Sequence, residues 1–408
     1  AKQFDTISAS MQKATKQAGW LADAMKSLKH HMMWMSSGIA FGAIVGIPVE
    51  AIRSIASVEK EMAGFKQVNH EANESQTVLN DTTSKFIGIA QRYGMSVEEI
   101  IQAGVLWGRG YKDINTVLQL TSVSAKLAVA DMMDVSLANR AVESVINSFQ
   151  KQGEAVKFAN HVVDSWTKVA HNAQSSAKDL ADALMRSAAA AKAVGVDFDT
   201  ATALASTMIK TTGLAGATIG ESMKSLFSSI HSKKAIQSLH ELGIEVYKFD
   251  ADGTRHFRNV QSVLLDLMTT SHTTSRNMEK DLLAISGGKF QWSKVASVLG
   301  DYKDFIHAYN LSIQSAGFNT GQIEAQLDTI SKRFQQLKAT VTGLFTNVGN
   351  GGLSAAIKSW IISVNNFIRA MQSIPASTYE TIGSIIKWTV ILGGSLKILK
   401  VISTSIVS

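Results

Sequence analysis

Apolar residues recur at alternating steps of three and four in three stretches of the chain. This spacing predicts heptad-patterned helices over residues 1–31, 319–348 and 353–374. The seam in the second stretch is the candidate oligomerisation site, and it consists of Ile323, Leu327, Ile330, Phe334, Leu337, Val341, Leu344 and Val348. A coiled coil produces such a seam, and so does an amphipathic helix packed on its own domain. Because few charge pairs flank the seam, both interpretations stay open.

Between these helices, the apolar pattern breaks into helices of ordinary length, and we expect one helical core over residues 57–318. Ser96 and Glu99 have the spacing of a capping box, which marks a helix start. Asp199 is the expected N-cap of a later helix, whose inward face carries Ala201, Leu204, Ala205 and Met208. Glycines stand where the helices should end, at Gly94, Gly110, Gly195, Gly213 and Gly243.

The helical pattern is interrupted once inside this core, by near-alternation of apolar and polar residues after Gly243. Asp252 and Gly253 then form the Asp-Gly pair that favours a tight turn, because glycine accepts the positive φ that such turns need. We therefore expect a short β-hairpin at about 244–257. The predicted fold class is all-α: a compact multi-helix core with this one hairpin, flanked by heptad-patterned helices and apolar segments.

The same stretch raises the possibility of a calcium loop through Asp250 and Asp252. With Gly253 as the loop glycine, the first ligand position would be Lys248 and the closing position would be Asn259. Neither residue supplies the carboxylate that such a loop requires at these positions. We therefore interpret the stretch as a turn.

Two segments, residues 32–56 and 377–408, are rich in apolar residues and glycine. The first includes MMWMSSGIAFGAIVGIPV, which has no charged residue and places Gly38, Gly42 and Gly46 on one helical face. A membrane-packing helix has such a stripe, and so does a helix held tightly inside a protein assembly. Because the chain starts with Ala and stops within an apolar stretch, we expect it to be a segment of a longer protein.

Composition and local motifs give no indication of catalysis. The chain has 408 residues, no cysteine, two prolines and a net charge of +7 that forms no basic block, so we expect no sequence-specific nucleic-acid partner. The ten histidines are scattered, and none belongs to a zinc-binding HExxH helix. The stretch GATIGESMKS lacks the Gly-Lys-Ser of a phosphate loop. We expect no enzyme activity, no catalytic residue, no cofactor and no metal site.

A series of glycine-centred elements resembles the core of phage tail tape measure proteins (minor tail proteins). The series begins at Gly195, continues through a glycine-spaced stretch and the hairpin, and ends with an element at 286–301 that reads SGGKFQWSKVASVLGD. Its middle glycines are Gly213, Gly216, Gly220 and Gly243. The resemblance extends over roughly residues 62–374. It departs from the family at 115–120, which lacks a proline-containing turn, and at Thr211–Thr212, where an Asn is common.

The resemblance implies a structural role in a virion. Members of the family lie inside the tail tube, set the tail length and leave the tube during infection to assist DNA passage across the host envelope. The implied partners are the tail tube protein and the tail tip or baseplate hub proteins, with the host membrane as a further one, and the heptad seams favour a homo-oligomer. The alternative is a membrane-active, pore-forming helical protein unrelated to tails.

Overall fold

The computed structural model describes residues 57–249, 253–273, 278–287 and 291–318, together with single positions between 327 and 343. Within these residues the chain is helical apart from one two-stranded hairpin, which confirms the predicted all-α fold class. Four predicted segments lie outside the described residues: 1–31, 32–56, 353–374 and 377–408. In the part of the chain that is described, no helix is both long and apolar enough to cross a bilayer.

The described residues fall into two compact units, and the first comprises 57–112 with the described positions from 327 onward. Residues 57–68 are helical, and three further helices follow: α4 (His70–Glu74), α5 (Gln76–Tyr93) and α6 (Val97–Gly110). The predicted capping box is present at the start of α6, where Ser96 and Glu99 bond each other's backbone N–H. The core of this unit places Phe65 edge-on against Phe86, with 5.2 Å between ring centroids.

The second unit comprises the described residues of 113–326 and carries most of the helices. In chain order its elements are α7 (Ile114–Ala130), α8 (Val135–Ser148), η1 (Gln152–Glu154), α9 (Ala155–Asn172), α10 (Ala177–Ala193), α11 (Phe198–Thr212), α12 (Gly216–Ser229), α13 (Lys233–Glu241), β1 (Tyr247–Phe249), β2 (Arg255–Phe257), α14 (Val260–Thr273), α15 (Glu279–Ile285), α16 (Trp292–Gly300) and α17 (Tyr302–Ile313). The predicted core of 57–318 thus includes residues of both units.

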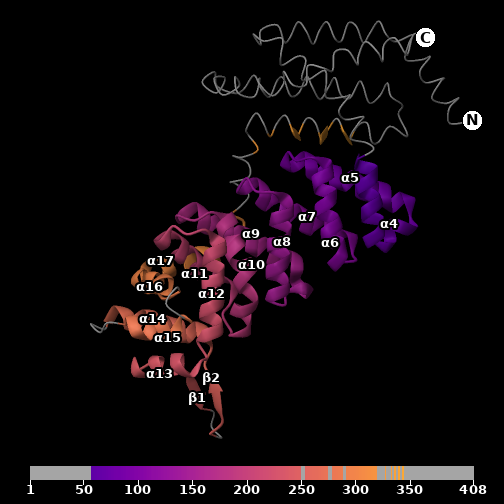
Figure 1. Cartoon of the computed structure of the whole chain (residues 1–408). Helices are drawn as coiled ribbons and strands as arrows, with labels where there is room; N and C mark the ends of the chain where they lie inside the picture. The colour runs from indigo at the N-terminus through magenta and orange to yellow at the C-terminus, as the bar shows by residue number, and fades with distance from the viewer. Residues whose placement is uncertain are drawn as a thin grey trace, which may run out of the picture. The chain divides into compact units, whose positions relative to one another are not determined.

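Helices α10 and α11 form the centre of the second unit. Helix α10 packs against α8, α9, α11 and α12, while α11 also packs against α16 and α17 (Figure 1). The predicted inward face of α11 is buried, as are the small hydroxyl residues between its apolar positions. A helix with small side chains all round can be enclosed by neighbours on every side.

The N-cap of α11 differs from the prediction. The carboxylate of Asp197, and not that of Asp199, accepts a hydrogen bond from the backbone N–H of Thr200, at 2.7 Å. The helix begins at Phe198, one residue after Asp197, and Val196 before this cap is buried. Asp199 lies within the first helical turn, where its side chain is available for contacts with other helices.

The hairpin is present where the sequence predicted it. Strands β1 and β2 are antiparallel, with Tyr247 opposite Phe257 and Phe249 opposite Arg255. Gly253 has a φ of +82°, as the predicted turn requires. Figure 1 shows the hairpin projecting from the end of the unit that contains α13. Asp250 and Asp252 lie outside the described residues.

Candidate functional site

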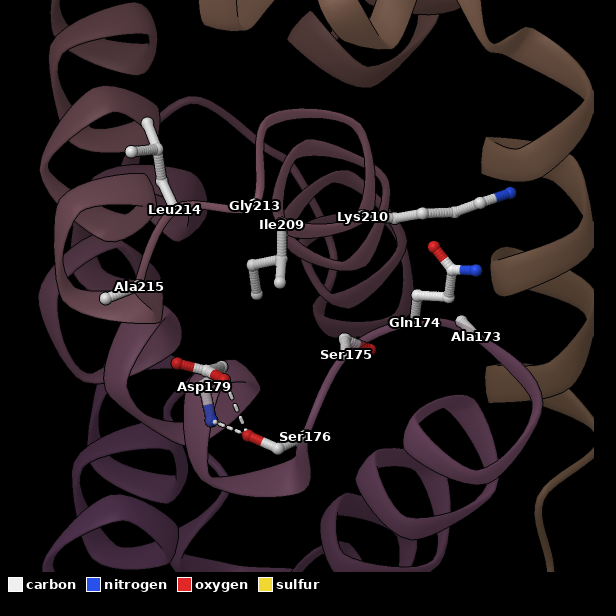
Figure 2. Close-up of a pocket in the computed structure, with 10 residues that line it drawn as sticks. All are labelled: Ala173, Gln174, Ser175, Ser176, Asp179, Ile209, Lys210, Gly213, Leu214 and Ala215. Carbon is white, nitrogen blue, oxygen red and sulfur yellow. Dashed lines mark hydrogen bonds between the residues drawn. The ribbon is translucent and has the colours of Figure 1, made fainter.

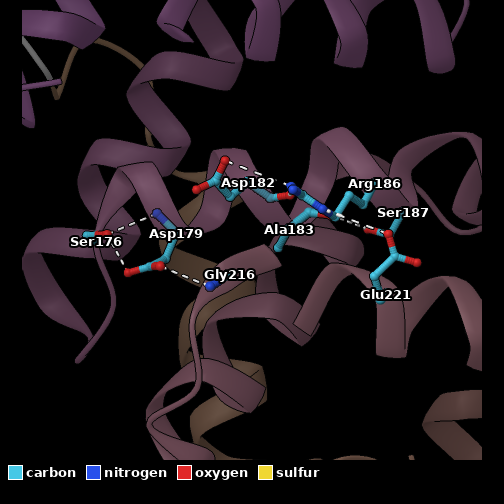
Figure 3. Close-up of polar contacts among 8 residues, drawn as sticks. All are labelled: Ser176, Asp179, Asp182, Ala183, Arg186, Ser187, Gly216 and Glu221. Atoms are coloured by element: carbon cyan, nitrogen blue, oxygen red, sulfur yellow. Dashed lines mark hydrogen bonds and ion pairs between the residues drawn. The ribbon is translucent and has the colours of Figure 1, made fainter. Parts of the chain in front are cut away.

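The most tightly built contact of the second unit is the crossing of α10 and α12, shown in Figure 3. A Cβ atom added to Gly216 would lie 1.9 Å from the carbonyl oxygen of Asp179, and one added to Gly220 would lie 2.5 Å from that of Ala183. Both distances are far below any real contact, so the two backbones touch directly. The crossing therefore requires glycine at both positions of α12.

Polar groups fix the end of this crossing. One carboxylate oxygen of Asp179 accepts a hydrogen bond from the backbone N–H of Gly216 at 2.9 Å, and the other accepts one from the hydroxyl of Ser176 at 2.7 Å. The Ser176 hydroxyl in turn caps α10 by accepting from the backbone N–H of Asp179. Ala215 cannot cap α12 with its side chain, so Asp179 satisfies that helix end from the neighbouring helix.

A weaker set of charges lies further along the same crossing. Arg186 on α10 has one guanidinium nitrogen 3.8 Å from Glu221 on α12 and another 3.9 Å from Asp182 on its own helix. These side chains are partly exposed, and pairs of this kind contribute little to stability. They orient the outer edge of the crossing, while the glycines determine how close the helices come.

An open cavity of about 710 Å³ adjoins this crossing and is drawn in Figure 2. The segment from Ala173 to Ser176 forms one side, and the end of α11 with the start of α12 forms the other. Its two charged groups are already engaged: Asp179 holds Ser176 and Gly216, and Lys210 extends away from Asp179 to pair with Asp304. The lining therefore offers no activated nucleophile or base.

A second polar cluster connects α9, α11 and α17. The Nε2 atom of His161 lies 2.9 Å from a carboxylate oxygen of Asp199, and the buried hydroxyl of Ser312 donates to that same oxygen. Ser165 shares a hydrogen bond with Ser312. The hydrogen bond to Asp199 raises the pKa of His161, against the opposing effect of burial.

This cluster contains Ser, His and Asp, but its geometry differs from that of a nucleophilic triad. In a triad the serine hydroxyl bonds the histidine, which then acts as its base. Here Ser312 and His161 both bond the carboxylate of Asp199, and Ser312 is fully buried. The arrangement joins three helices, and the serine bonds the carboxylate instead of the histidine.

A buried ion pair provides a third connection. Lys126 on α7 lies 3.1 Å from Asp164 on α9, and the two side chains are 15% and 8% exposed. The other carboxylate oxygen of Asp164 accepts from the backbone N–H of Gly317 at 2.7 Å, beyond the end of α17. One carboxylate therefore holds three segments that are distant in the sequence.

Most of the sites predicted from sequence lie outside the described residues. These are Gly38, Gly42 and Gly46, and the seam residues Ile323, Ile330, Phe334, Leu337, Val341, Leu344 and Val348. Leu327 is described, and it is helical and half-buried. In the same stretch a Cβ on Gly343 would lie 2.6 Å from Ile87 of α5, so part of it packs within the first unit. The coiled-coil seam stays a prediction.

The packing role of Gly216 and Gly220 was not predicted. The sequence placed them only in the glycine series that resembles the family, and the structure places both within α12. The usable signal was their spacing of four, which places both on one helical face. The alanine-rich sequence of α10 supplied the matching small surface.

The chain is similar in sequence to phage tail proteins. The phage-related minor tail protein family matches residues 80–285, which is half of the chain. A tape measure protein of Pneumococcus phage Dp-1 is 21% identical over 270 residues, covering 65% of this chain and 22% of the relative. The chain therefore spans about a fifth of that relative's length. No solved structure matches this chain. The chain belongs to the phage-related minor tail protein family.

Proposed function

We propose that this chain is a segment of a tail tape measure protein, which acts as a scaffold for tail tube assembly and in tail-length determination. The observation that carries the proposal is the similarity to a curated tape measure protein across 65% of the chain. The contacts of the second unit are consistent with a structural role, because the Lys126–Asp164 and His161–Asp199 pairs each join two helices. Membership of a tail protein family implies a location in the virion, and the pore-forming alternative is not favoured.

Within such a protein, we assign the length-setting role to sequence outside the second unit. As one continuous helix, the 214 residues from 113 to 326 would span roughly 320 Å at about 1.5 Å per residue. A compact domain of this size has a radius of gyration of about 17 Å. A folded unit therefore adds little length. The heptad-patterned helices span more distance per residue, and we assign the length-setting role to them.

The proposed partners are the tail tube protein, which would polymerise around the extended helices, and the tail tip or baseplate hub proteins. We propose that copies of the chain associate through the heptad seam that includes Leu327. In this scheme the protein leaves the tube during infection and reaches the host envelope, where the membrane is a further contact. These roles extend beyond the family assignment and follow from what a tape measure must do.

The test is the length of tails assembled with altered full-length protein. Deletion of two heptads, which are 14 residues, from its longest heptad-patterned helix should shorten tails by about 21 Å. The matched control is Gly216→Leu in the same protein, which disrupts the α10–α12 crossing without changing chain length. Tails with that variant should have the original length wherever they assemble. A tail length that is indifferent to the deletion would contradict the proposal.

A further inference from the structure

The hairpin exposes two large aromatic side chains to solvent. On β1 and β2, Phe249 is 69% exposed and Phe257 is 45% exposed. The register places Tyr247, Phe249, Arg255 and Phe257 on one face, and Arg255 lies over the ring of Tyr247 at 4.2 Å. A two-stranded ribbon is marginal by itself in water, and an exposed aromatic face marks an interaction surface.

The hydrogen-bond register shows which backbone groups remain available. Arg258 donates its backbone N–H to Val246, so these two residues form a hydrogen-bonded pair at the base of the ribbon. Pairs alternate along an antiparallel ladder, which makes Tyr247–Phe257 and Phe249–Arg255 the pairs without mutual bonds. The N–H and C=O groups of Tyr247 and Phe249 therefore point outward along the free edge of β1.

The β1 edge is the more accessible of the two. On β2, the ring of His231 packs on Phe257, with 4.4 Å between ring centroids. Beside the start of β1 there is instead a groove of about 510 Å³. Its lining comes from α13 and from Glu245, Val246 and Tyr247. An added strand would thus find backbone partners along β1 and a groove at the base of that strand.

The charges on β1 specify what such a strand should carry. Lys248 is exposed and forms no ion pair with any described residue, and it lies opposite His256 on the second face. In an antiparallel added strand, the residue opposite Lys248 would occupy a close, non-hydrogen-bonded position, where opposite charges stabilise and like charges destabilise. Its neighbours on either side would lie beside Tyr247 and Phe249, which favour apolar β-branched or aromatic partners.

We propose that the outer edge of β1 is a docking site for an extended segment of another polypeptide, which adds as a third strand and reads apolar–acidic–apolar opposite Tyr247, Lys248 and Phe249. Backbone hydrogen bonds supply the general affinity, and the pairing with Lys248 supplies selectivity. This inference rests on the hairpin alone and holds whether or not the chain sets tail length.

The binding test uses the full chain and two fluorescent peptides, Ser-Thr-Val-Glu-Val-Thr-Ser and its counterpart with Lys in place of Glu. We expect the wild type to bind the Glu peptide about fivefold more tightly, the scale of exchanging an opposite for a like cross-strand charge. The exposed substitution Lys248→Glu should reverse this preference. Equal binding of both peptides, or no binding at about 1 mM, would overturn the proposal.

A second pair of variants separates edge pairing from contact with the aromatic face. Phe249→Ala keeps the outward N–H and should weaken binding, whereas Phe249→Pro removes that donor and should abolish it. Arg255→Pro removes an outward N–H from the β2 edge and should leave binding intact. Hydrogen exchange at Tyr247 and Phe249 should slow when the Glu peptide binds.

The same variants would identify two other occupants of the β1 edge, an oligonucleotide or a second copy of the chain. Evidence for either occupant would contradict the proposal. Binding of a thymidine oligonucleotide, lost in Phe249→Ala while neither peptide binds, would identify a base-stacking surface. Concentration-dependent dimerisation that is lost in Phe249→Pro, with no competition from the Glu peptide, would identify a second copy of the chain.

Discussion

The carbonyl oxygen of Asp179 occupies the space that a side chain on Gly216 would need, 1.9 Å from the position of the missing Cβ. Helix α10 therefore approaches α12 along its backbone, and the adjacent Gly220 maintains the same closeness one turn later. The contact has no room for a residue larger than glycine at position 216. Single substitutions there should therefore lower the stability of the second unit.

Gly216→Ala should destabilise the second unit by about 3 kcal/mol, the upper part of the range for overpacking, because the clash is with backbone. The measurement is urea unfolding of the full chain, with hydrogen exchange used to assign the loss to α10 and α12. The matched control is Gly88→Ala in α5, where an added Cβ would meet nothing within 4 Å beyond its chain neighbours and the nearby backbone of its own helix, so the substitution should stabilise by about 1 kcal/mol. Equal effects of the two substitutions would contradict the close contact.

Asp179→Ala should cost about 1–2 kcal/mol, because it removes the acceptor for the N–H of Gly216 and the partner of Ser176. Asp179→Asn retains an oxygen facing Gly216 and should cost much less. Thermal unfolding of the two variants makes the comparison. A similar loss in both would show that the negative charge, and not the hydrogen bond, stabilises the helix ends.

Lys126→Met should cost about 3 kcal/mol, because it leaves the carboxylate of Asp164 buried without its cation. In an Asp164→Asn background, which keeps an acceptor for Gly317, the same substitution should have little effect. A double-mutant cycle from chemical unfolding measures the difference. Additive losses would mean that the two side chains are not coupled.

The His161–Asp199 contact should make stability depend on pH. The hydrogen bond to Asp199 raises the pKa of His161 in the folded chain above its ordinary value of 6.5. The folded state therefore holds this proton more tightly than the unfolded state, and the stabilisation is fully present below about pH 6.5. It is lost as the pH rises through the raised value.

The corresponding experiment compares the wild type with His161→Gln between about pH 5 and 8. The difference in free energy of unfolding should be largest at the acidic end and should shrink toward the alkaline end. Asp199→Asn serves as the control, because it removes the charge that holds the proton while retaining an oxygen for Ser312. A difference that grows with pH would reverse the sign and contradict the assignment.

The features predicted correctly from sequence are those whose causes are local. Ser96 and Glu99 are three residues apart and bond each other, and the hairpin depends on strands joined by a short turn at Gly253. Local sequence does not determine the N-cap of α11, because Asp197 and Asp199 have the same side chain and either could cap the helix. The packed fold distinguishes them, because Asp199 bonds His161 and Ser312 on other helices while Asp197 bonds the backbone of its own helix.

The candidate site was less predictable because its partners are distant in the sequence. His161 is 38 residues from Asp199, and Asp164 is 153 residues from the backbone N–H that it accepts. No periodicity within one helix indicates which residue of another helix will face it. The spacing of Gly216 and Gly220 places both on one helical face, but it does not identify Asp179 and Ala183 as the residues that they contact.

The α10–α12 crossing also has a consequence for how the unit forms. Gly216 and the Asp179 carboxylate that it bonds are only 37 residues apart, with α11 between them. Closing a loop of this size costs little more entropy than closing a much shorter one, and contacts of modest sequence separation form early and rapidly. This crossing is therefore suited to form early when the second unit folds.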